Sequence, residues 1–141
     1  MDNLFNEIKK AFIEHNDLKA KTLSDDIYLE MCTSPMHCLR TIFKKSGYTK
    51  NELVEISEIG ERTIEYYLYS FQRNYQKKVL VRLLLSLNIP PLIFLHILNI
   101  CGCSLNIANE FDSWIAYIIQ HRWYKAFKEN LEFLEKINIF I

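Results

Sequence analysis

Hydrophobic positions recur at three- and four-residue steps along most of the chain, which is the period of an amphipathic helix. The first run predicts a helix over residues 3–20, and a weaker helical segment follows over 25–32. Ser34 precedes Pro35, a pair typical of an N-cap and a first helical position, and Gly47 stands where a helix can stop. We therefore expect a third helix over 35–46.

The next segment carries two short amphipathic runs. Thr49 and Glu52 have the spacing of a capping box, so a helix is expected to begin at Lys50. The dipeptide Ile59–Gly60 interrupts it, and a second run begins directly afterwards. Two short helices separated by about three residues have the layout of a helix-turn-helix.

Four further helical runs fill the rest of the chain. Asn74 is a candidate cap for the first, and Pro90–Pro91 begins another that ends near Gly102. Asn109 is a candidate cap for a penultimate helix, and a last one is expected over 124–137. No alternation typical of a strand extends along the chain, so the sequence predicts an all-α protein of seven to nine helices.

Composition supports a compact helical domain. Half of the 141 residues are hydrophobic, whereas Gly and Pro number only three each, too few for many tight turns. Residues 83–109 contain no Asp, Glu, Lys or Arg, but Pro90–Pro91 interrupts them and we expect no membrane span. Residues 1–21 lack the pattern of a secretory signal, so a cytoplasmic location is expected.

Cysteine and histidine positions do not predict a reactive centre. The spacings of Cys32, Cys38, Cys101 and Cys103 match no zinc-finger pairing, although a ligand set of Cys32, His37 and Cys38 is conceivable. We interpret the cysteines as reduced, buried residues. The sequence contains no glycine-rich phosphate loop, nucleophile elbow or paired metal motif, so we expect neither an enzyme nor a cofactor.

Residues 50–68, KNELVEISEIGERTIEYYL, resemble the helix-turn-helix of the Cro/lambda-repressor-like (XRE) family of small bacterial or phage regulators. The opening ERTI of the second helix is similar to the family's common start, and NYQKKVLVRLLLSLNIPP resembles the helix pair that follows. The similarity covers about residues 38–104. It implies a lambda-repressor-like core over 35–104, an N-terminal helical segment over 1–34, and a C-terminal helical extension over 105–141.

One position departs from the family pattern. Glu58 occupies the turn position that usually holds glycine. Either Glu58 adopts a positive φ, or the turn shifts by a residue and uses Gly60.

The resemblance implies sequence-specific transcriptional regulation through double-stranded DNA, with the second helix in the major groove. Lys50 is then a phosphate contact at a helix N-terminus. Arg62 suits a contact with guanine, Glu61 with cytosine, Thr63 with a thymine methyl and Tyr66 with a phosphate. For Arg62 and Glu61, the role of a solvated charge on the helix surface is an equally good explanation. The implied DNA-binding residues are Lys50, Gly60, Glu61, Arg62, Thr63, Tyr66, Arg73, Lys77 and Lys78.

The distribution of charge agrees with this interpretation in part. The formal net charge is zero, but residues 40–82 hold nine basic and five acidic residues and balance at +4, against −3 for 1–39 and −1 for 83–141. One small motif contacts few base pairs, so a homodimer is expected on DNA.

The alternative is a protein-binding module on the same fold, an inhibitor of a host or phage enzyme or an antitoxin. Tyr66 and Tyr69 are of a residue type favoured at protein interfaces, and the C-terminal helices are rich in such residues. Core packing is the simpler explanation for some of the tyrosines.

Overall fold

The computed structural model describes residues 2–31, 34–70 and 74–141. Across these residues the fold is all-α, as predicted, with nine helices and no strand. The helices in chain order are α1 Leu4–Ile13, α2 Asp17–Leu29, α3 Pro35–Ser46, α4 Lys50–Ser57, α5 Glu61–Tyr69, α6 Lys77–Ser86, α7 Pro91–Ile100, α8 Glu110–His121 and α9 Phe127–Lys136.

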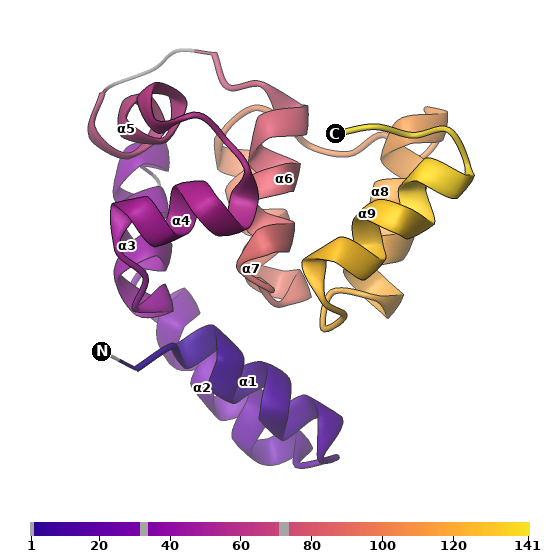
Figure 1. Cartoon of the computed structure of the whole chain (residues 1–141). Coiled ribbons are helices and arrows are strands. Elements are labelled where there is room, and N and C mark those ends of the chain that lie inside the picture. The colour runs from indigo at the N-terminus through magenta and orange to yellow at the C-terminus, as the bar shows by residue number, and fades with distance from the viewer. Residues whose placement is uncertain (1, 32–33, 71–73) are drawn as a thin grey trace.

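Figure 1 shows three groups of helices around a central pair. Helices α1 and α2 lie side by side at the N-terminal end, and α3, α4 and α5 form one flank. Helices α8 and α9 form the opposite flank, and α6 and α7 stand between the two. Each flank packs on the central pair, because α3 and α4 contact α7 and α6, while α8 and α9 contact α7 and α6.

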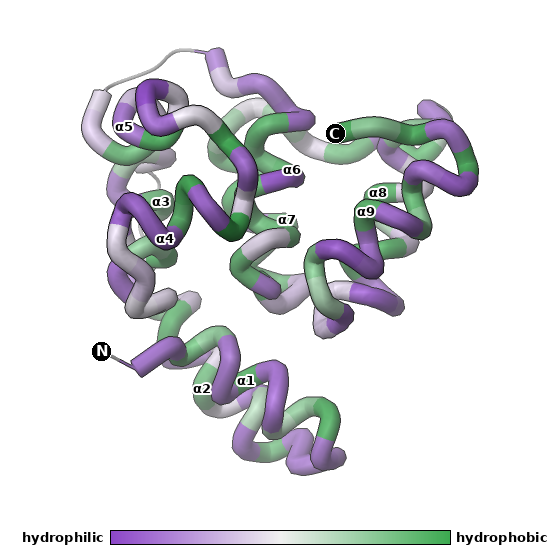
Figure 2. Tube along the Cα trace, in the orientation of Figure 1, coloured by the Kyte–Doolittle hydropathy of each residue, from purple (hydrophilic) through white to green (hydrophobic). Residues whose placement is uncertain are grey.

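The central pair supplies the most deeply buried part of the core. Leu80 and Leu84 of α6 and Ile93, Phe94 and Ile97 of α7 have no exposed side-chain surface, and the same helices carry much of the hydrophobic colour at the centre of Figure 2. One hydrophobic cluster extends from α1 to the segment after α9, so it includes residues from all three predicted segments. The boundaries at 34 and 104 stay a prediction.

The predicted single helix over 3–20 is wrong. The chain forms two helices there, because His15 adopts a positive φ of 59° and Asn16 caps α2 by accepting a hydrogen bond from the amide of Lys19. The segment expected over 25–32 is the second half of α2, which ends at Leu29. Apolar spacing continues across the break, so periodicity alone joined the two helices.

Several predicted helix ends are confirmed. Ser34 is the N-cap of α3 with Pro35 in its first turn, and Gly47 ends that helix with a φ of 73°. Pro90 is the N-cap of α7 and Pro91 its first residue, so the uncharged stretch over 83–109 is broken as expected. Among the described residues, no helix has the length and hydrophobicity to cross a membrane.

Two other predicted ends are displaced. Helix α6 begins at Lys77 after Gln76, not after Asn74, because the Gln76 amide donates to the hydroxyl of Tyr67, 3.0 Å away. The last helix is shorter than 124–137 and begins at Phe127.

The described cysteines are buried. Cys38, Cys101 and Cys103 lie in the hydrophobic cluster as thiols that form no disulfide with one another, and burial raises the pKa of Cys101 to about 12. This confirms the structural interpretation for these three, while Cys32 lies outside the described residues.

Candidate nucleic-acid interface

The N-terminus of α4 is fixed by the predicted capping box. The hydroxyl of Thr49 accepts from the amide of Glu52 at 3.2 Å, and a carboxylate oxygen of Glu52 accepts from the amide of Thr49 at 3.0 Å. The hydrogen bond from the Thr49 amide, and after it the nearby Thr49 hydroxyl, lower the pKa of Glu52, since donors beside the carboxylate favour its charged form. Lys50 therefore occupies a defined position at the first turn of α4.

The turn between α4 and α5 takes the first of the two routes allowed by the sequence. Glu58 adopts the left-handed conformation with a φ of 56°, whereas Gly60 has a φ of −58° and is the N-cap of α5. Arg82 of α6 holds the strained turn, because its Nε donates to the carbonyl of Ser57 at 2.7 Å and its Nη2 donates to Glu58 at 3.0 Å. The turn thus needs no glycine at residue 58.

Helix α5 is held against the core along one face. Ile64, Tyr67 and Leu68 are buried, and the Tyr67 hydroxyl accepts the Gln76 amide at the start of α6. Burial raises the pKa of Tyr67 despite that hydrogen bond. The opposite face of α5 is consequently turned outward in one orientation.

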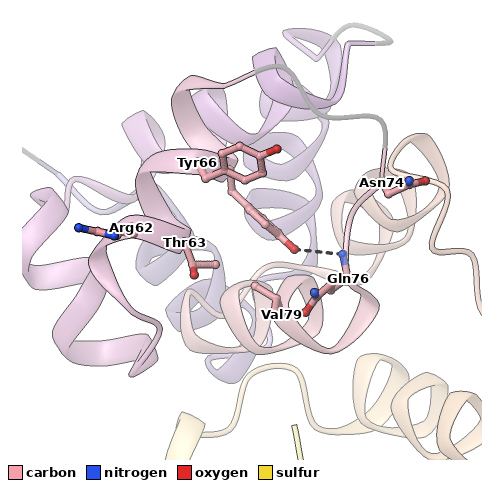
Figure 3. Close-up of a pocket in the computed structure, with 7 residues that line it drawn as sticks. Arg62, Thr63, Tyr66, Asn74, Gln76 and Val79 are labelled. Atoms are coloured by element: carbon pink, nitrogen blue, oxygen red, sulfur yellow. Dashed lines mark hydrogen bonds between the residues drawn. The ribbon is translucent and has the colours of Figure 1, made fainter.

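That outward face carries Arg62, Tyr66 and Tyr69, which lie at positions i, i+4 and i+7 of the helix. Tyr66 and Tyr69 are each 53% exposed. A cavity of about 410 Å³ separates Arg62, Thr63 and Tyr66 from Asn74, Gln76 and Val79 (Figure 3). A second cavity of about 380 Å³ extends along Lys50, Arg62, Glu65, Tyr66, Tyr69 and Ser70. Tyr66 therefore forms a ridge between two hollows.

Lys50 is engaged in ion pairs with the acidic side chains of α5. Its ammonium lies 2.6 Å from Glu65 and 3.3 Å from Glu61. The hydrogen bonds to Glu65 and then Glu61 raise the pKa of Lys50. The structure thus places the predicted phosphate contact, Lys50, beside the predicted cytosine contact, Glu61, and the two opposite charges partly offset each other.

The two predicted lysines of α6 are also held by other groups. The ammonium of Lys77 donates to the carboxylate of Asp112 at 2.9 Å and to the carbonyl of Ser104 at 3.1 Å. Lys78 lies over the ring of Phe111 at 5.5 Å. Both side chains therefore contact the first turn of α8 or the segment that leads into it.

Arg62 and Thr63 keep the positions that the sequence indicates. Arg62 is exposed in the first turn of α5 and Thr63 is half-buried beside it. Within the part of the chain that is described, Arg62 has no carboxylate partner. Arg73, the remaining predicted contact, lies outside the described residues.

The positive balance of residues 40–82 does not belong to the two helices of the motif. Helices α4 and α5 carry two basic side chains, Lys50 and Arg62, against Glu52, Glu55, Glu61 and Glu65, and Glu58 lies between them. The pair with its turn therefore balances at −3. The excess positive charge comes from α3 and α6.

Sequence reasoning did not single out Arg40 of α3. Its Nε donates to the carbonyl of Leu68 at 2.6 Å, and its guanidinium lies over the ring of Tyr69 at 5.1 Å. The signal was the spacing of Arg40 and Lys44, which places two cations on one face of a helix. Nothing in the sequence indicated that this face lies beside α5.

The described residues hold no group of three His, Cys, Asp or Glu side chains arranged to bind a metal ion. Comparison with protein-family models, with curated proteins and with solved structures finds no match. The assignment of function therefore rests on the geometry of α3, α4 and α5.

Proposed function

We propose that this protein is a DNA-binding transcriptional regulator that presents α5 to the major groove. One observation carries the proposal: α5 is buried along Ile64, Tyr67 and Leu68 and directs Arg62, Thr63 and Tyr66 outward from its first two turns. Base reading by a helix-turn-helix uses residues at this end of the second helix. Arg62 suits a bidentate contact with guanine, and the Tyr66 hydroxyl suits a phosphate.

The ion pairs of Lys50 change the roles assigned from the sequence. By binding Glu61 and Glu65, Lys50 offsets part of the negative charge of the two carboxylates on the flank of α5, which would otherwise repel phosphates more strongly. Lys50 then acts by shielding the carboxylates as well as by its position at a helix N-terminus. Base reading rests chiefly on Arg62 and Thr63.

A homodimer on a two-fold DNA site belongs to the same proposal, because one copy offers a short reading surface. A candidate dimer surface lies on α8 and α9. Tyr117 of α8 is 43% exposed and stacks on Phe133 of α9 at 5.9 Å, so both rings lie near the surface of that flank.

The test is selection of genomic DNA fragments by the purified protein, followed by binding measurements on the selected sequences at salt concentrations from about 50 to 200 mM. We expect Arg62→Ala to lose discrimination between selected and random duplexes by about 1–3 kcal/mol. Arg62→Lys keeps the charge but loses the bidentate geometry, so it should bind duplexes without recovering discrimination. Absence of wild-type binding at the lowest salt concentration contradicts the proposal.

A second candidate function is binding of a protein partner through the same face. It is favoured by the half-exposed Tyr66 and Tyr69 beside the two cavities and by the −3 balance of α4, α5 and their turn, since exposed tyrosines anchor protein interfaces. This candidate function predicts that wild type binds a protein partner and that Tyr66→Arg does not. It also predicts that wild type shows no salt-dependent binding to duplex DNA.

A further inference from the structure

Besides Arg62 on α5 itself, an exposed cation with no carboxylate partner among the described residues lies on α3, which packs against α5. Lys50 and Lys77 each bind a carboxylate, and Arg82 is held by Ser57, Glu58 and the main-chain oxygen of Ile141. In contrast, Lys44 is exposed and has no carboxylate or carbonyl partner among the described residues. Helix α3 therefore carries a cation that is available to a phosphate near the outward face of α5.

Helix α3 presents its basic side chains as a stripe. His37, Arg40 and Lys44 occupy positions i, i+3 and i+7, which lie on one face of a helix. They line a hollow of about 490 Å³ together with Glu30, Thr41 and Lys45. Lys45 binds Glu30 at 2.8 Å, but the Glu30 side chain is 54% exposed, so solvent and salt weaken this pair.

The stripe is continuous with the outward face of α5. Arg40 connects them, because it donates to the carbonyl of Leu68 and stacks on Tyr69. Tyr69 in turn lines the cavity that contains Arg62 and Tyr66. Arg62, Tyr66, Tyr69, Arg40 and Lys44 thus follow one another across the surface from α5 to α3.

We propose that α3 binds the phosphate backbone of the DNA that α5 reads, with Lys44 and the free end of the Arg40 guanidinium as contacts. The inference rests on the proposed function. Arg40 uses Nε for the protein, and its two terminal nitrogens keep the planar donor geometry that suits phosphate. Lys45 joins the contact when it exchanges the Glu30 carboxylate for a phosphate.

A duplex fits this stripe better than an acidic protein does. The cations form a line that continues the reading face, and the hollow beside them is lined mainly by charged and polar side chains. A line of cations follows a charged backbone, whereas protein interfaces are centred on buried apolar anchors. Because α4, α5 and their turn carry a net charge of −3, the electrostatic attraction of phosphates is assigned to the stripe on α3.

The experiment measures binding of a labelled random duplex of about 20 base pairs, roughly two helical turns, over a salt series. Lys44→Gln should weaken binding roughly fivefold to tenfold at about 0.1 M salt and lower the log–log salt slope by about 0.9. Lys44 lies in the last turn of α3 and also favours the helix dipole, so thermal unfolding is measured in parallel. Lys10→Gln is the matched control, since Lys10 is exposed in the last turn of α1, outside the stripe and the candidate dimer surface.

Glu30→Gln supplies a variant whose effect cannot come from damage to the fold. It releases Lys45 and removes a negative charge from the hollow, so binding to the same duplex should tighten about threefold or more. Glu7→Gln, a matched loss of an exposed carboxylate on α1, should change the affinity less.

The outcomes separate this inference from the proposed function. If wild type binds the duplex, and both Lys44→Gln and Glu30→Gln keep its affinity and salt slope, the role of α3 is overturned and the role of α5 is left intact. Absence of wild-type binding overturns both. If the protein binds a poly-glutamate peptide with an affinity equal to or higher than its affinity for the duplex, the stripe is assigned to an acidic protein. That result also overturns the inference.

Discussion

The ammonium of Lys77 lies 2.9 Å from a carboxylate oxygen of Asp112, and this ion pair joins the start of α6 to the start of α8. The Asp112 side chain is only 6% exposed and also accepts the amide of Asn106 at 2.8 Å. A predicted DNA contact is therefore used to attach the C-terminal flank to the centre of the fold.

Asp112→Asn should lower the free energy of unfolding by about 2 kcal/mol, because a hydrogen bond to a charged partner is replaced by a weaker neutral one. Lys77→Met should cost about 3 kcal/mol, since it leaves the buried carboxylate without its cation. Urea denaturation followed by circular dichroism measures both. Asp26→Asn, at an exposed position of α2, is the control, and equal midpoints for Asp112→Asn and wild type would contradict a stabilising pair.

The capping box of α4 predicts both a cost and a pH dependence. Thr49→Ala should destabilise the protein by about 1 kcal/mol, which is typical for loss of an N-cap. Glu52 has a lowered pKa in the folded state, so its contribution is present above the ordinary glutamate pKa of 4.5 and is lost as the pH falls through the folded value.

Stability measured from neutral to acidic pH should therefore converge for wild type and Glu52→Gln at the acidic end. Glu55→Gln, an exposed neighbour on α4, serves as the control. A gap between wild type and Glu52→Gln that persists unchanged in acid would rule out the charged form of Glu52 as its source.

Under the proposed function, removal of a carboxylate from α5 should strengthen binding to DNA. Glu65→Gln takes away the partner at 2.6 Å from Lys50 and one negative charge beside the reading face. We expect the affinity for a random duplex to rise severalfold and the salt slope to steepen, because Lys50 becomes available to a phosphate. Fluorescence anisotropy measures both quantities. Glu7→Gln on α1 controls for the change in net charge, and weaker binding of Glu65→Gln would show that the ion pair is needed to shape the site.

Tyr75 should titrate late in alkali. Its ring packs edge-on against Tyr67 at 5.3 Å, and burial raises the Tyr75 pKa from 10.0 to about 12. The folded state therefore retains a proton that the unfolded state loses, and stability falls as the pH rises from about 10 toward 12.

Ultraviolet difference spectra of wild type and Tyr75→Phe should differ mainly near pH 12, where the Tyr75 phenolate forms. The unfolding midpoint of wild type should also fall more steeply than that of Tyr75→Phe over this range. A spectral difference complete by pH 10 would show that the Tyr75 hydroxyl is accessible to solvent.

Local chemistry explains which parts of the fold were predictable. The Thr49 capping box, Gly47 after α3 and Pro90–Pro91 before α7 act within a few residues, so a short window of sequence contains their cause. The break at His15 was missed because the apolar spacing of α1 continues across it, and no glycine marks the position that takes the positive φ.

The candidate site was predictable in position but not in electrostatics. The sequence alone determined that the protein is helical, that two short helices surround a turn near Glu58, and that Arg62 and Tyr66 share a face of the second helix, because 3.6-residue periodicity and caps are local properties. Only the tertiary structure decided which charges remain available. Lys50 meets Glu65 across 15 residues and Lys77 meets Asp112 across 35, and Arg40 reaches α5 across 28. Such pairings depend on how helices pack, which no local pattern specifies.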